Sequence, residues 1–178
     1  MSEKKDFYEK AKKQMRFSER ILAEIPGFRG YKEKELRRES DKLIRNHLYR
    51  KLSEAKSDLK DVFQELSDRR LFEVLTNMDR LVAKVDRIAE KVNHASYGYT
   101  GFFNIVKVKE ENLDEMINFD NQLVDDVENL ASEVNTFKAE VMKQDIKKAK
   151  DRIQHLTETL EALEETFDKR GEVILGVS

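Results

Sequence analysis

The stretch LDEMINFDNQLVDDVENLASEVNTFKAEV, residues 113–141, decides the fold of this chain. Apolar residues recur in it at alternating spacings of four and three, so they share one face of an α-helix. The members of this seam, apolar except for Asp120, are Leu113, Met116, Asp120, Leu123, Val127, Leu130, Val134, Phe137 and Val141. A nearly strict heptad pattern of this length predicts a long helix that packs against others, as in a coiled coil.

The same periodicity recurs through the rest of the 178 residues. Glycines at 27 and 30, 98 and 101, and 171 and 176, with Pro26, separate the periodic segments, because helix interiors tolerate Gly and Pro least. The fold class is therefore expected to be all-α. One domain over residues 1–178 should form an elongated antiparallel helical bundle, or coiled-coil hairpins, of about five helices. These helices are predicted over roughly 3–24, 31–66, 68–94, 110–142 and 146–170.

Two helix boundaries are predicted from breaks in the stripe alone. After Leu66 the next apolar member is Leu71, and Ser67 or Asp68 would cap a new helix there. The stripe also slips after Val141, where Asp145 would act as the cap. A second hairpin is the favoured interpretation, and one continuous helix with a stutter is the alternative.

The last residues are expected to leave the helix. Gly171 suits a helix C-cap, with an apolar tail over 171–178 behind it. Val173–Val177 could pair as a short strand with the β-branched residues Ile105, Val106 and Val108.

Composition narrows the class of protein. Charged residues make up 39 % of the chain, yet the net charge is only −2 and the apolar spacing is regular, which favours helices over disorder. The chain has no cysteine, so disulfides, thiolate catalysis and cysteine-based metal sites are excluded. Neither a signal peptide nor a membrane span is apparent, and the expected location is the cytoplasm.

The sequence offers no constellation for catalysis. Glu90 and His94 are four residues apart, as are Asp151 and His155, which predicts solvated pairs on helix faces. His47 stands alone and is expected to be solvated as well. The glycine pairs lack a Walker lysine and the dinucleotide-binding spacing. The protein is therefore expected to be no enzyme, with no cofactor, no metal and no small-molecule substrate.

Charge is distributed unevenly along the chain. Residues 1–60 contain 18 basic and 11 acidic residues, whereas Glu110–Glu133 contains nine carboxylates and no Lys or Arg. The favoured interpretation is that the two signs meet across helix pairs within the bundle. The alternatives are that the opposite charges attract one subunit to another, or that the basic residues bind an anionic partner. The overall negative charge argues against nucleic acid as the partner.

Two junctions combine glycine with aromatic rings, at residues 25–31 and 95–108. Glycine permits unusual backbone angles, while rings can close the end of a bundle or serve as binding hot spots. Either interpretation, corner plug or docking surface, fits the pattern. The candidate partner-docking residues are Phe28, Tyr31, Tyr97, Tyr99, Phe102 and Phe103.

The stretches IPGFRGYKEKELRRESDKLIRNHL and ASYGYTGFFNIVKVKEENLDEM resemble an uncharacterised family of bacterial and archaeal helical proteins. The resemblance covers roughly residues 20–130 and implies no activity, cofactor or catalytic residue. Similarity to phage-shock protein A, a membrane-remodelling scaffold, extends to helical architecture and charge alone.

These observations favour a non-enzymatic scaffold or adaptor that binds a protein partner or self-associates. The alternative is a peripheral membrane scaffold, whose basic helix over 3–24 would lie on anionic lipid. The apolar stripe of that helix is narrow and contains Ser18, which suits packing on a bundle better than insertion into a membrane.

Overall fold

The computed structural model of the chain describes residue 25 and residues 36–95 and 110–175. These residues form four helices and no strand: α2 (Leu36–Asp68), α3 (Phe72–His94), α4 (Glu110–Met142) and α5 (Ala149–Leu175). The all-α prediction is confirmed. The helix count is four rather than about five, because the helix expected over 3–24 lies outside the described residues.

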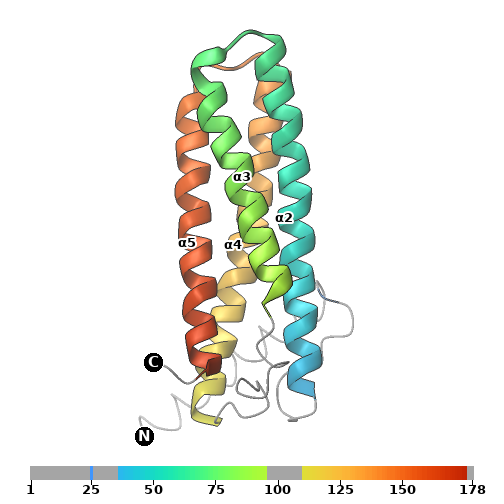
Figure 1. The fold of residues 1–178 in the computed structure, drawn as a ribbon, viewed down its shortest axis with the longest axis vertical. Helices are drawn as coiled ribbons and strands as arrows, with labels where there is room; N and C mark the ends of the chain where they lie inside the picture. Colours follow the sequence, from blue (N-terminus) through green and yellow to red (C-terminus); the bar gives the residue numbers. More distant parts are fainter. Residues whose placement is uncertain (1–24, 26–35, 96–109, 176–178) are drawn as a thin grey trace, which may run out of the picture.

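The four helices lie side by side as a helical bundle (Figure 1). α2 and α3 form one hairpin and α4 and α5 a second, so the predicted second hairpin is confirmed and the single long helix is wrong. α2 packs on α3 and α4, and α5 packs on the same two helices. Both hairpin turns lie at one end, called here the turn end. α2 and α4 begin, and α3 and α5 end, at the opposite junction end.

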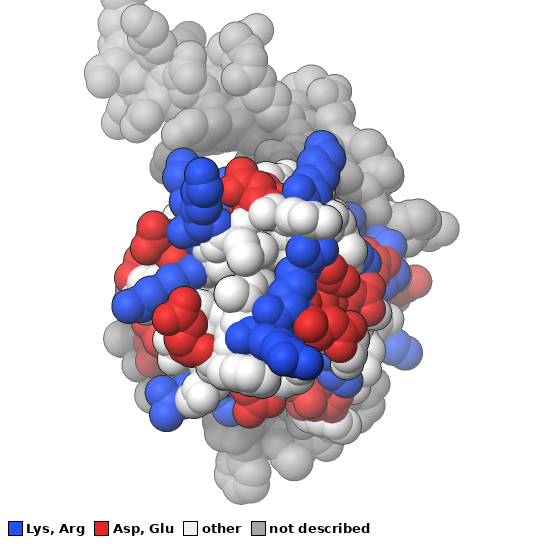
Figure 2. Space-filling view, turned by 90° about the horizontal axis from the view of Figure 1, so that it is seen from above, with Lys and Arg blue, Asp and Glu red and all other residues white. Residues whose placement is uncertain are grey.

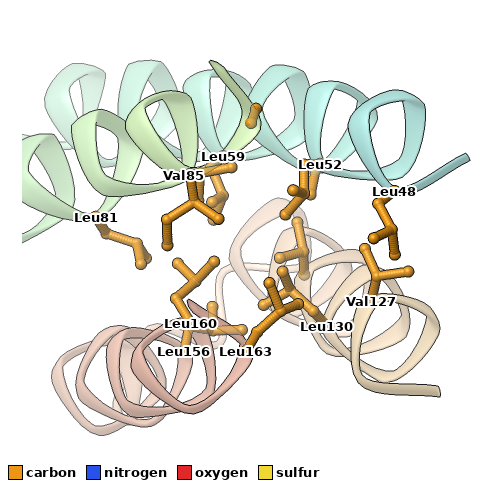
Figure 3. Packing of buried hydrophobic residues seen from close by; sticks show 14 of the residues in the cluster. Leu48, Leu52, Leu59, Leu81, Val85, Val127, Leu130, Leu156, Leu160 and Leu163 are labelled. Carbon is orange, nitrogen blue, oxygen red and sulfur yellow. The ribbon is translucent and has the colours of Figure 1, made fainter. Parts of the chain in front are cut away.

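Aliphatic side chains from all four helices fill the interior. Leu52 and Leu59 of α2, Val85 of α3 and Leu130 of α4 are fully buried. In Figure 3 they point toward one another and toward Leu160 of α5. Burial of this apolar stripe explains why highly charged segments stay helical, since packing of an amphipathic face supplies most helix stability in proteins.

The two hairpin turns share one hydrogen-bonding pattern. Arg70 has φ 60° and Gln144 has φ 68°, both in the left-handed region. At the first turn the Arg70 amide donates to the Ser67 carbonyl and the Leu71 amide to the Leu66 carbonyl. At the second, the Gln144 amide donates to the Val141 carbonyl and the Asp145 amide to the Glu140 carbonyl. This pair of bonds defines a Schellman C-cap, here with a side-chain-bearing residue where glycine is usual.

The predicted caps at these turns are wrong. Ser67 and Asp68 are the last residues of α2, and α3 begins after Leu71, whose side chain makes no capping hydrogen bond. α5 begins at Ala149, not beside Asp145. The Schellman bonds satisfy two carbonyls in the last turn of each helix, Leu66 and Ser67 in α2 and Glu140 and Val141 in α4, so the helices end without a polar side-chain cap.

The predicted helix C-cap at Gly171 is also wrong. This residue lies within α5, which continues to Leu175, and is itself buried. Val173 and Ile174 are buried in the core, and their burial outweighs the roughly 1 kcal/mol that glycine costs inside a helix. The expected strand is therefore wrong for residues 173–175.

Candidate functional site: buried charges and the junction end

The six aromatic residues proposed for partner docking, Phe28, Tyr31, Tyr97, Tyr99, Phe102 and Phe103, lie outside the described residues. The structure nevertheless places the helix ends to which both junctions are joined in sequence. α3 ends at His94 and α4 begins at Glu110, on either side of one junction, and α2 begins at Leu36 after the other. All three helix ends are at the junction end. Ile25, the first residue of the other junction, is buried in the hydrophobic core.

A buried charged network crosses the bundle near this end. Arg170 of α5 has no exposed surface and pairs with Asp120 of α4 and Asp41 of α2. Its Nη2 donates to Asp41 Oδ1 at 2.8 Å, and its Nε donates to Asp120 Oδ1. Asp41 also accepts from Arg45 Nε at 2.9 Å. Two cations and two carboxylates thereby tie three helices together.

Arg170, Asp120 and Asp41 lie at positions where the helix periodicity predicts buried apolar side chains. Asp120 lies between Met116 and Leu123, Arg170 follows Phe167 by three residues, and Asp41 precedes Ile44 by three. All three neighbours Met116, Phe167 and Ile44 are buried. Sequence reasoning placed Asp120 in the seam but missed its partners. The signal was available: a charge of each sign at a core position on different helices.

This arrangement favours a positioning role over proton chemistry. Arginine stays protonated at any physiological pH, and its planar fork fixes the direction of each carboxylate that it binds. Burying charges costs free energy that their attraction offsets only when the geometry is right. A shift of α5 against α2 or α4 would break the pairs, so the network selects one register of the helices.

His47 is buried, contrary to the prediction that it is solvated. Its side chain is 5 % exposed, and its Nε2 lies 3.2 Å from Glu128 Oε1 on α4. Arg50 Nη2 lies 3.4 Å from its Nδ1. Burial lowers the pKa of His47 below its ordinary value, and Glu128 only partly opposes this effect. His47 directly precedes the stripe residue Leu48, which places it on the flank of α2 against α4.

A ladder of ion pairs joins α3 to α5. Lys84 pairs with Glu161, Arg87 forms two hydrogen bonds to Glu164 at 2.6 and 2.7 Å, and Lys91 bonds to Glu164 and Asp168. The hydrogen bonds from Arg87, helped by Lys91, lower the pKa of Glu164 to about 2, against its partial burial. Bases on one helix and acids on the other therefore supplement the apolar contact between α3 and α5.

Three carboxylates of the acidic stretch of α4 meet basic groups on other helices of the bundle. Lys51 Nζ donates to Glu128 Oε2 at 2.9 Å, in addition to the His47 contact. Glu133 Oε1 lies 3.1 Å from His155 Nε2, and Asp120 pairs with Arg170. The favoured interpretation, in which opposite charges meet across helix pairs, is confirmed for these three carboxylates.

The other two histidines are on the surface, as predicted. His94 Nε2 lies 3.1 Å from Glu90 on the same helix. His155 is exposed but pairs with Glu133 of α4 instead of Asp151. Within residues 36–95 and 110–175, no group of three or more histidines and carboxylates is placed to hold a metal ion. No helix in this part of the chain is long and apolar enough to cross a membrane.

Comparison with known protein families, with curated proteins and with solved structures found no match to this chain.

Proposed function

We propose that this protein is a non-enzymatic helical scaffold or adaptor of the cytoplasm that binds a protein partner, or a second copy of itself, at its junction end. The observation that carries the proposal is the position of the helix ends. Both Gly-aromatic junctions are joined in sequence to helices that begin or end there. Two segments rich in aromatic rings and glycine at one end of a bundle would concentrate typical hot-spot residues in one area.

The charged network supports this proposal through rigidity. Arg170, Asp41 and Asp120 connect α5, α2 and α4 near the junction end. A platform whose helices are held in one register loses less conformational entropy when a partner docks. We also propose that the hairpins are coiled coils, because heptad seams of this kind are used for self-association as well.

The test compares paired serine substitutions of Tyr97 and Tyr99 with the wild-type chain. We expect unchanged thermal unfolding together with loss of a defined interaction, either self-association in sedimentation velocity or a partner crosslinked through a photoreactive residue at position 102. The control is Thr76→Ser with Asn77→Ser, at two exposed positions of α3. Lower stability without any lost interaction would instead make the junction a corner plug and refute the docking role.

The alternative function, a peripheral membrane scaffold that uses the basic helix expected over 3–24, concerns residues outside the described part. Deleting residues 1–24 and measuring flotation with anionic vesicles tests it directly. Loss of flotation on this deletion would favour the membrane alternative.

A further inference from the structure

The turn end of the bundle combines exposed apolar side chains with unpaired positive charge. Phe72, the first residue of α3, is 66 % exposed, and Met142, the last of α4, is 45 % exposed. They are the two large hydrophobic residues that stand exposed among the residues the structure describes. Because each adjoins a hairpin turn, both lie at the same end of the molecule.

Basic side chains surround this apolar pair. Residues 69–73 and 142–150 contain six Lys or Arg and two acidic residues, in a chain whose net charge is −2. Arg69 is paired with Glu65, and Lys148 adds to the attraction that Arg152 exerts on Glu140. Five exposed bases, Lys148 included, form no direct ion pair with any carboxylate that the structure describes. They are Arg70, Lys143, Lys147, Lys148 and Lys150. Figure 2 looks down on this end and shows Lys and Arg around a central uncharged area, with acidic side chains interspersed on the sides.

Hairpin geometry explains why these residues are not buried. The Schellman bonds at Arg70 and Gln144 already satisfy two carbonyls in the last turn of α2 and two in that of α4. The turns therefore need no contact from Phe72 or the lysines. Apolar surface rimmed by charged residues is typical of interaction sites, and these two large side chains lie on neighbouring turns beside cations that form no direct ion pair.

We infer that the turn end binds the surface of an anionic lipid bilayer, with Phe72 and Met142 entering the interface and the surrounding lysines contacting the headgroups. Charge complementarity selects an anionic occupant. The apolar side chains protrude, so the occupant must receive them in an apolar medium, which the interfacial region of a bilayer provides. Four of the five cations are lysines, point charges that suit a diffuse anionic surface better than the paired geometry of one carboxylate.

This inference does not rest on the proposed docking role of the junction end, and it uses a different surface from the basic segment 3–24. Contact at the turn end would leave the junction end directed away from the membrane, because the helices run between the two ends.

The experiment measures partition of the full chain onto vesicles of phosphatidylcholine with roughly 30 mol% phosphatidylserine, at about 0.1 M salt, where only nearby charges interact strongly. Wild type should bind these vesicles and not vesicles of phosphatidylcholine alone. Lys147→Gln with Lys148→Gln should weaken the partition about 25-fold, at about fivefold for each cation. Phe72→Ser should weaken it about tenfold.

The matched control is Lys60→Gln with Arg80→Gln, which removes the same charge from exposed sites on α2 and α3 that form no ion pair with a described carboxylate. It should stay within about twofold of wild type, since each site lies about 12 Å along its helix from the end of α2 or the start of α3, beyond the Debye length of about 10 Å at this salt. Equal loss in this control, equal binding by the turn-end variant, or binding to neutral vesicles would overturn the inference.

Two further measurements identify other occupants. Binding to soluble poly-glutamate that depends on Lys147 and Lys148, without binding to vesicles, would identify an acidic polypeptide. Concentration-dependent dimerisation without lipid, abolished by the same variant, would identify a second copy of the chain. Either result would overturn the assignment to a bilayer.

Discussion

Arg170 on α5 and Asp41 on α2 lie 129 residues apart in the chain, yet Arg170 Nη2 donates to Asp41 Oδ1 over 2.8 Å inside the bundle. Asp120 on α4 accepts a hydrogen bond from Nε of the same guanidinium. The pair links the first described helix with the last. Its effect is to make the relative position of the two hairpins depend on one buried guanidinium.

Replacing Arg170 by Met should lower the free energy of unfolding by about 3–5 kcal/mol, because it leaves buried carboxylates without their cation. Urea unfolding at neutral pH measures the loss. Lys169→Met is the adjacent control and should leave stability nearly unchanged, since Lys169 is exposed and pairs with Glu165 on its own helix. Adding Asp120→Asn to Arg170→Met should recover part of the loss, because it removes one buried charge. A loss below about 1 kcal/mol would contradict the positioning role.

Glu164 should make stability depend on pH in the acid range. The pKa of its carboxyl is about 2 in the folded chain, below its ordinary value of 4.5, because Arg87 and Lys91 stabilise the ionised form. The stabilisation is therefore complete above about pH 4.5 and is lost as the pH falls through about 2. At neutral pH, Glu164→Gln should cost about 1 kcal/mol, less than the shift alone suggests, since Arg87 is largely exposed.

Urea unfolding of wild type and Glu164→Gln at several pH values checks this expectation. The two curves should converge toward pH 2 and also approach each other in molar salt, which screens exposed charges. A difference that stays constant from pH 7 to pH 2 would show that the glutamine disturbs packing instead of removing an ion pair.

His47 should make stability depend on pH in the same direction as Glu164, but near neutral pH. Burial lowers its pKa from 6.5 in the folded chain, so the unfolded chain binds the proton more readily. Stability should then decline as the pH falls below about 6.5, down to the lowered pKa, where the loss is complete. His47→Gln should remove this component of the pH dependence, and His155→Gln should keep it, because His155 is 56 % exposed. Nuclear magnetic resonance titration of the His47 ring tests whether its pKa is lowered in the folded chain.

The core can be tested at seam positions. Leu130 is 0 % exposed and Leu156 is 1 % exposed. Replacing either by Ala should cost about 2–5 kcal/mol in urea unfolding, from lost burial and the remaining cavity. His155→Ala should be nearly neutral. The reverse order would mean that the faces of α4 and α5 are assigned wrongly.

Periodicity alone predicts most of this fold, because apolar stripes mark which face of a helix is buried. Val127, Leu130 and Val134 are all buried where the seam requires it. Helix ends were harder to predict. Arg70 and Gln144 adopt positive φ without being glycine, so no residue type marks the turns. Gly171 gave a misleading signal, because burial of its neighbours decides its conformation.

The candidate site was only partly predictable. Asp120 could be placed in the seam from its spacing, but its partner Arg170 lay at the predicted end of the last helix, before a glycine taken as its cap. Tertiary contacts between residues 41, 120 and 170 depend on which helices are neighbours. A single sequence does not specify that arrangement, since several bundle topologies bury the same stripes.

The turns themselves provide the last prediction. A side chain at positive φ is crowded by its own backbone at a cost of roughly 1 kcal/mol, which glycine avoids. Gln144 has φ 68° and makes the Schellman bond through its backbone amide, which glycine retains. Gln144→Gly should therefore raise the free energy of unfolding by up to about 1 kcal/mol, reduced by the greater freedom of the unfolded chain. Lys143→Gly is the control: Lys143 is exposed, and its φ is not positive, so glycine there should lower stability. Urea unfolding of both variants measures the contrast. If Gln144→Gly is as destabilising as Lys143→Gly, the turn does not carry the strain that its backbone angle implies.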